Sequence, residues 1–288
     1  NRALSGPVNI HCDHADVMGM RDSGWIVLFS ESGQEAYDNA LQAVRIAEHP
    51  DVLLPVAVCQ DGFITSHGME RVEIDDDGRV RAFVGDYRPR WPLLDLANPK
   101  TYGPLDFYDY YYEHKRQQMA AMDCAQQVIG DVAHAFNEAF GRSYGPFEAY
   151  RLDDADVAIL VVNSTAGTAR AVVDGLRAGG TKAGLLKLRV FRPFPARELA
   201  AALRHLKALA VMDRSVSFGA TDNAGPLFLE VAATLAVQGV RLPVLGVVYG
   251  LGGRDIRPAE IEGIYRDLLH TAATGRVDRP VTHVGVRE

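Results

Sequence analysis

The chain has 288 residues, enough for two domains of ordinary size, and its 48% hydrophobic share is normal for a globular protein. The net charge of −7 and the scattered basic residues argue against a nucleic-acid-binding surface, and no apolar run approaches the roughly 20 residues of a membrane helix. Three distant cysteines, Cys12, Cys59 and Cys124, fit buried thiols in a reducing cytoplasm better than disulfides, and no signal peptide is visible.

The first part of the chain predicts one strand–helix–strand unit. Residues Trp25–Ser30 are apolar and β-prone, the apolar positions of Gln34–Glu48 recur at close to helical spacing, and Val52–Cys59 is a second apolar run. Such a unit implies a parallel sheet with a right-handed crossover. In an open α/β sheet, ligands bind at the carboxyl ends of the strands, so the polar residues that follow each run are candidates for a site.

A long middle segment separates this unit from the rest of the chain. The charged stretch Glu70–Asp86, with a turn at Asp75–Gly78, predicts an excursion on the surface, for which a hairpin is one form. Residues Tyr87–Tyr112 are rich in proline and aromatic residues, which indicates an ordered strap packed on a domain or on a partner subunit rather than a disordered linker. Glu113–Phe140 has one apolar face and predicts a long helix, which the following glycines and Pro146 end.

Strands and helices then alternate regularly. The expected strands are Val157–Val162, Ala183–Val190, Leu209–Asp213 and Val244–Tyr249. The expected helices are Ala169–Ala178, Pro195–Lys207, Pro226–Gln238 and Pro258–Thr274. Four such units predict a doubly wound α/β domain, so we divide the chain into residues 1–112, a connecting helix at 113–146, and residues 147–288.

Two groups of polar residues follow the first two predicted strands and would face the crevice: Ser30 and Glu31, then Asp61, Thr65 and His67. The alternative for the first group, together with Ser32, is N-capping of the next helix. The alternative for the second group is a glycine turn with a capping hydroxyl.

Residues 11–16 are candidates for a metal site, because His, Cys and Asp are zinc ligands. They are His11, Cys12, Asp13, His14 and Asp16. Consecutive residues of an extended chain point alternately to opposite sides, however, and no second pair follows at a suitable spacing. We therefore expect a hydrogen-bonded loop here and no metal.

Two glycine-containing turns could in principle cradle a phosphate. Asn163–Thr168 follows a strand and precedes a helix, and Gly250–Gly253 follows another strand. Neither has the dinucleotide fingerprint or the lysine of a P-loop, so both are expected to be plain turns.

Several stretches, taken in their order and spacing, resemble the alpha chain of the 2-oxoacid:ferredoxin oxidoreductases, most closely the pyruvate type. They are Arg2-Ala-Leu-Ser5, Asp13-His14 with Asp16, Arg21–Trp25, Ser32–Asn39, Asp61-Gly-Phe63 with Thr65-Ser-His67, and Leu186–Pro195. The resemblance spans nearly the whole chain. It implies an α/β fold in which residues 1–112 are the latter part of a thiamine-diphosphate pyrimidine-binding domain and residues 147–288 a domain like the transketolase C-terminal one.

The resemblance also implies roles for single residues. Arg2 matches the arginine that holds the substrate carboxylate, a task suited to a planar guanidinium fork. The alternative for a residue at position 2 is an exposed, disordered side chain. Ser30, Glu31, Asp61, Thr65 and His67 are the expected cofactor-binding or site-shaping residues.

The implied reaction is oxidative decarboxylation of a 2-oxoacid, pyruvate by family likeness, with coenzyme A. It gives acyl-CoA, CO2 and reduced ferredoxin, or runs in reverse. Thiamine diphosphate and Mg2+ would be shared with a partner subunit. A cluster takes four cysteines in a tight pattern, so [4Fe-4S] clusters would lie on beta, gamma or delta-type subunits. The electron-transfer partner would be ferredoxin or flavodoxin. We expect no nucleic acid and no membrane as a partner.

No residue matches the family's upstream glutamate, which hydrogen-bonds the aminopyrimidine ring of the cofactor. We expect either a fragment or an upstream segment on a separate chain, and a chain that is inactive without its partners. Two alternatives stay open. One is a transketolase-like thiamine enzyme component, and the other is a non-catalytic scaffold subunit.

Overall fold

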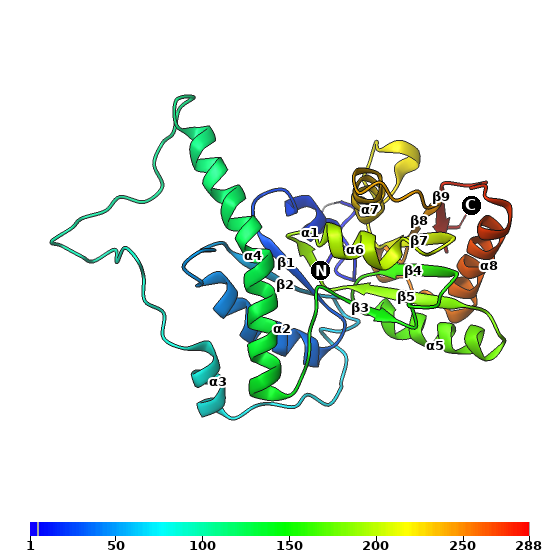
Figure 1. Ribbon diagram of the computed structural model, residues 1–288, viewed down its shortest axis with the longest axis horizontal. Helices are drawn as coiled ribbons and strands as arrows, with labels where there is room; N and C mark the ends of the chain where they lie inside the picture. Colours follow the sequence, from blue (N-terminus) through cyan, green and yellow to red (C-terminus); the bar gives the residue numbers. More distant parts are fainter. Residues whose placement is uncertain (5, 288) are drawn as a thin grey trace.

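The computed structural model describes residues 1–4 and 6–287, and these form two β-sheets with helices packed on them (Figure 1). The smaller sheet has the strand order β2-β1-β6, and the larger has the order β3-β5-β4-β7-β8-β9. The predicted α/β class is confirmed. Within the described residues, no helix combines the length and apolar character needed to cross a membrane. Ser5, the last residue of the Arg2 motif, lies outside the described residues.

The smaller sheet contains the predicted strand–helix–strand unit. β1 (Ile26–Ser30) and β2 (Val56–Gln60) are parallel, and α2 (Gly33–Ala47) connects them. The second strand was expected from Val52 but begins at Val56. Leu53 has a positive φ of 48° and turns the chain, while its two apolar neighbours fill the core from this loop.

Two helices of this unit did not follow from the sequence patterns, α1 (Ala15–Met20) and α3 (Asp77–Val84). The surface position predicted for Glu70–Asp86 is confirmed, since most of these residues are exposed, but the hairpin is wrong. The Asp76 carboxylate accepts two backbone hydrogen bonds from the first turn of α3, at 2.9 and 3.2 Å, and so caps the helix. The helix then buries Phe83 in the core.

α4 (Tyr111–Phe140) confirms the long helix. Its C-terminal half packs on α2 and α3, and the ring of Phe136 lies edge-on to that of Phe83 with 5.3 Å between centroids. Gly141 ends the helix in the left-handed conformation, which favours glycine. The division of the chain at residues 112 and 146 stays a prediction.

The larger sheet is doubly wound, as predicted. Its strands are β3 (Phe147–Tyr150), β4 (Val157–Val161), β5 (Ala183–Leu188), β7 (Ala208–Asp213), β8 (Val244–Tyr249) and β9 (Val281–Val284). All pair in parallel except β3, and neither β3 nor β9 was expected. One face carries α5 (Thr165–Ala178) and α8 (Pro258–Thr274), and the other carries α6 (Ala196–Leu203) and α7 (Pro226–Val237). Short 3-10 turns are η1 (Thr221–Asn223) and η2 (Leu251–Gly253).

A short strand joins the two sheets. The strand predicted at Ala183–Val190 is confirmed up to Leu188. There the chain leaves the larger sheet and forms β6 (Val190–Arg192), which pairs antiparallel with β1. The cause is the buried Arg189, whose guanidinium donates to Asn39 Oδ1 and Gln42 Oε1 of α2, at 2.8 and 2.9 Å. The smaller sheet is therefore completed by a strand from the second half of the chain.

Residues 86–110 form no helix or strand and project from the body between α3 and the free end of α4 (Figure 1). The predicted strap is therefore extended. Most of its aromatic side chains are exposed and do not pack into a domain of this chain.

Candidate functional site

The carboxyl ends of both sheets face each other, and three buried polar residues meet there. Ser30 ends β1, Asp61 follows β2, and Asn163 follows β4. The Asn163 side chain accepts from the Ser30 backbone N–H at 3.0 Å and donates to Asp61 Oδ1 at 2.8 Å. The predicted positions of Ser30 and Asp61 at strand ends are confirmed, and the structure adds a partner from the second half of the chain.

Asp61 forms most of the hydrogen bonds of this junction. Its carboxylate bonds His14 Nε2 at 2.8 Å and accepts from the Ser164 backbone N–H at 3.2 Å and from the Ser164 hydroxyl. Burial alone would raise the pKa of Asp61, but the His14 and Arg214 side chains and the hydrogen bonds outweigh it and hold the pKa well below its usual range. Asp61 is therefore an ionised carboxylate at the N-terminus of α5, where the helix dipole favours an anion.

This explains the turn at Asn163–Thr168. A helix N-terminus can hold a phosphate, but here the protein's own Asp61 carboxylate occupies that position. Asn163 has a positive φ of 57°, which asparagine tolerates better than most residues, and this turns its amide toward the junction. The turn joins the two halves of the chain.

Cys12 completes a buried group with His14 and Asp61, whose potential ligand atoms lie within 4.8 Å of one another. Cys12 and His14 are two positions apart and reach the same side, and Asp61 comes from β2. Burial raises the pKa of the Cys12 thiol to about 12, and the Asp61 oxygens are already bonded to protein donors. The three residues therefore form part of a buried hydrogen-bonded network. That they bind no metal stays a prediction.

A second, exposed cluster gathers around Phe63. The Arg2 guanidinium carbon lies 5.4 Å from the centre of the Phe63 ring, the His67 ring stacks on it at 4.2 Å, and the His11 ring lies 4.7 Å away. Gly62 permits this approach, since a Cβ there would lie 2.7 Å from the Asn1 carbonyl oxygen. The structure therefore brings the predicted residues Arg2 and His67 together through Phe63, which sequence reasoning did not single out.

The backbone around Phe63 fixes the orientation of His67. Phe63 has a positive φ of 64°, and its N–H donates to Ser66 Oγ at 3.0 Å. The Ser66 hydroxyl and His67 Nδ1 share a hydrogen bond of 2.7 Å, so Nε2 is the ring nitrogen that remains for a further contact. Thr65 lies behind this loop, and its hydroxyl donates to the Glu31 carbonyl at 3.4 Å.

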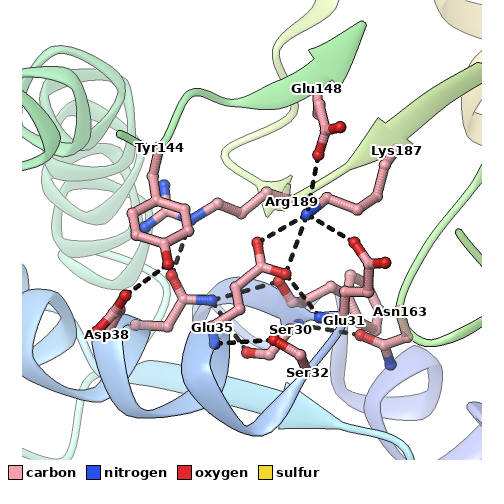
Figure 2. Close-up of polar contacts among 12 residues, drawn as sticks. Ser30, Glu31, Ser32, Glu35, Asp38, Tyr144, Glu148, Asn163, Lys187 and Arg189 are labelled. Carbon is pink, nitrogen blue, oxygen red and sulfur yellow. Dashed lines mark hydrogen bonds and ion pairs between the residues drawn. The ribbon is translucent and has the colours of Figure 1, made fainter. Parts of the chain in front are cut away.

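Glu31 faces the second half of the chain rather than this cluster. Its carboxylate forms a two-point ion pair with Arg170 of α5. It also lies 3.2 Å from Lys187 Nζ of β5 (Figure 2). Burial would raise the pKa of Glu31, but the hydrogen bond from Arg170 and the charge of Lys187 lower it. Lys187 also bonds Glu35 of α2 at 3.0 Å.

The N-cap of α2 is Ser32, whose hydroxyl accepts from the Glu35 backbone N–H at 3.2 Å (Figure 2). The capping alternative is thus confirmed for Ser32. Ser30 is fully buried, and its hydroxyl oxygen accepts a hydrogen bond from the Asn39 side-chain amide at 3.0 Å. That Ser30 and Glu31 contact a cofactor stays a prediction.

A cavity of about 670 Å³ lies beside the start of the chain. Residues 3–22 form one wall, with Arg21 and Asp13 among its polar groups, and the loop 215–218 forms the other. Its size is within the range of small-molecule sites, and Ala3, the neighbour of Arg2, lines it.

Two family models match the chain. Residues 1–134 match "Pyruvate flavodoxin/ferredoxin oxidoreductase, thiamine diP-bdg", and residues 155–261 match "Pyruvate:ferredoxin oxidoreductase core domain II".

Curated relatives are similar over almost the whole chain. Pyruvate synthase subunit PorA of Thermotoga maritima is 50% identical over 289 residues, which cover 100% of this chain and 72% of the relative. PorA of Methanothermobacter thermautotrophicus is 41% identical with the same coverage. Ketoisovalerate oxidoreductase subunit VorA of Pyrococcus abyssi is 36% identical, covering 98% of this chain and 70% of the relative.

Among solved structures, the fold resembles 2-oxoglutarate:ferredoxin oxidoreductase from Magnetococcus marinus, with a TM-score of 0.59 at 15% identity. The match covers 93% of this chain and 47% of that chain, so this chain spans about half of its length. At this identity the likeness concerns the fold alone.

Proposed function

The chain belongs to the pyruvate flavodoxin/ferredoxin oxidoreductase family as an alpha subunit, and on this premise we propose that it orients the 2-oxoacid for thiamine-dependent oxidative decarboxylation. Pyruvate is the proposed substrate, since the relatives with the higher identities are named pyruvate synthase subunits. The products are acetyl-CoA, CO2 and reduced ferredoxin or flavodoxin, or the reaction runs in reverse.

The observation that carries this proposal is the exposed cluster around Phe63. The Arg2 backbone N–H donates to Asp16 Oδ2 at 2.8 Å, and its guanidinium lies over an aromatic ring rather than beside a carboxylate. Its donors are therefore available to the carboxylate of a 2-oxoacid. The His67 imidazole stacks on the same ring and adds a second polar group beside Arg2.

The residues present fit the substrate half of a thiamine site but not its diphosphate half. Two exposed polar groups, an aromatic face and a nearby cavity suit an anionic substrate and a heterocycle. The two carboxylates at this edge, Asp61 and Glu31, are already bonded to protein donors and are poorly placed to take a Mg2+–diphosphate. We therefore assign that half to a partner subunit.

Thiamine diphosphate supplies the nucleophilic carbon and the electron sink when it is bound. The residues of this chain have simpler tasks. Arg2 binds and orients the carboxylate, His67 forms a hydrogen bond to the substrate through its Nε2, and the buried Asp61 junction keeps the loop at residues 61–67 in place. Such positioning accounts for much of the rate enhancement in enzymes.

The remaining partners follow from the family and from the cysteines. Burial raises the pKa of Cys12 and of Cys59 to about 12, and only Cys124 is exposed, so the three do not form a cluster site. We propose that the [4Fe-4S] clusters lie on beta, gamma or delta-type subunits, that coenzyme A is the co-substrate, and that the complex works in the cytoplasm.

The test uses the complete complex and 2-oxoacid-dependent reduction of a viologen dye, with and without thiamine diphosphate and coenzyme A. We expect cofactor-dependent reduction with pyruvate as the preferred acid. Arg2→Ala should raise KM for pyruvate by about 10- to 100-fold, the value of a charge-assisted hydrogen-bonded pair. Arg279→Ala, at a distant exposed position, is the matched control.

Each outcome has a clear meaning. No reduction with any 2-oxoacid, in a complex with intact clusters and bound cofactor, would refute the proposal. An unchanged KM in Arg2→Ala would show that this chain does not bind the carboxylate, as expected of a scaffold subunit.

A further inference from the structure

The segment at residues 86–112, here called the arm, carries an unusual share of exposed apolar side chains. Of the 27 large hydrophobic side chains exposed among the described residues, 12 lie in the arm. Leu93, Leu94, Leu96 and Leu105 are 70–90% exposed, and Tyr108 is 98% exposed. Scattered apolar side chains are normal on a protein surface, but such a concentration marks an interaction site.

The arm has little support from its own chain. Its backbone hydrogen bonds are local turns, such as Asp95 N–H to the Pro92 carbonyl at 3.3 Å and Asn98 N–H to the Asp95 carbonyl at 3.2 Å. Its contact with the body includes Tyr87, Trp91 and Tyr102, which border a small cavity beside Leu53. Figure 1 shows the rest leaving the body and returning at the projecting end of α4. Four prolines stiffen this path.

The composition of the arm is that of an interface core. Its 27 residues include six tyrosines, one tryptophan and one phenylalanine, but no glutamate and one lysine. Interfaces are enriched in aromatic residues and arginine and depleted in lysine and glutamate. Four aspartates, two arginines and one lysine leave the arm nearly neutral, although the chain as a whole carries −7.

The exposed area is large enough for a stable complex. An aromatic side chain buries about 150–250 Å², and the eight in the arm are each at least half exposed, so together they offer on the order of 1,000 Å². A specific interface needs about 800 Å² from each partner. The arm alone meets that requirement, and two arms would form an obligate interface.

We propose that the arm pairs with the arm of a second copy of this chain around a two-fold axis. It has two sets of exposed apolar side chains, the leucine set (Leu93, Leu94, Leu96 and Leu105) and the aromatic set (Phe107, Tyr108 and Tyr110–Tyr112). In an isologous contact, the leucine set of each copy lies on the aromatic set of the other. A single second copy therefore covers both sets on each chain. The near-neutral charge of the arm lets two copies approach there despite the charge of each chain.

The direct test is a disulfide between two copies in the assembled complex. One copy carries Leu94→Cys and one tag, and the other carries Tyr111→Cys and a second tag, both in a Cys124→Ser background. Because the two cysteines are on different chains, a disulfide can form only between copies. In complexes purified through both tags, we expect most of the chain to become cross-linked on mild oxidation, and a pair with Val237→Cys in place of Leu94→Cys to give less than a tenth of that yield.

A second measurement does not depend on cysteine geometry. Replacing Leu93, Leu94 and Leu96 together by serine should halve the mass of the assembly in light scattering while the circular dichroism spectrum stays unchanged. The matched control replaces the exposed Ile74, Val237 and Val286 by serine and should keep the mass.

Two results would overturn the proposal. One is an undiminished mass in the arm variant together with no cross-link. The other is loss of a different subunit from the complex while the two copies of this chain stay together, which would make the arm a docking site for that subunit.

Discussion

Replacing Asp61 by asparagine tests the junction between the two halves of the chain. The amide has the same shape as the carboxylate, so it removes the charge and turns one acceptor into a donor. It can still accept on one side, but on the other its NH2 faces the Ser164 N–H that Asp61 bonds at 3.2 Å. An orphaned buried N–H costs about 1–3 kcal/mol, and the lost charge at the α5 N-terminus costs up to about 2 kcal/mol.

We therefore expect Asp61→Asn to lower the free energy of unfolding by about 3 kcal/mol. With an unfolding entropy of about 2.1 cal/mol/K per residue over 288 residues, Tm falls by about 5 °C. Urea denaturation followed by circular dichroism measures the first value and calorimetry the second. Asp22→Asn, at a side chain that is 75% exposed, is the control and should change stability by less than about 1 kcal/mol.

The same variant changes the dependence of stability on pH. The pKa of Asp61 is lower in the folded state than in the unfolded chain, so its contribution is present above about pH 4 and is lost as the pH falls through the folded pKa. Wild-type protein should lose more stability than Asp61→Asn between pH 6 and pH 3. Equal stability of the two proteins at pH 7, or parallel pH curves, would refute the reasoning that Asp61 is an ionised helix cap.

Three further changes test the exposed cluster and the local geometry. Phe63→Ala removes the ring under the Arg2 guanidinium and should raise KM for the 2-oxoacid about tenfold with a smaller change in kcat, while Phe63→Tyr stays near wild type; equal loss in both variants would contradict the platform role. Gly225→Ala places a Cβ 2.0 Å from Asp213 Cγ and should destabilise the fold by at least about 3 kcal/mol, as read from thermal melts. Gly130→Ala in α4 meets no atom within 4 Å and should stabilise by about 0.5–1 kcal/mol, so a loss of stability there would show that the helix is not formed as described.

The sequence patterns were sufficient wherever a local rule decides the structure. Periodicity located α2, α4, α7, α8 and most strands, because an apolar stripe or run must face a core whatever lies around it. The family motifs were also readable along the chain, and they singled out Arg2 and His67, which the structure brings together on the Phe63 ring. The one local signal that was overlooked is Asp76, a capping residue hidden in a charged stretch.

The tertiary structure decided which partners the polar residues find. Asp61, Asn163 and His14 are far apart in the sequence, and no local pattern shows that the first fills the helix N-terminus beside the second. The same holds for Arg189, whose burial against α2 pulls β6 into the first sheet. Hydrogen bonds and ion pairs are specific to the two groups that meet, so they can be assigned only once the sheets and helices are packed.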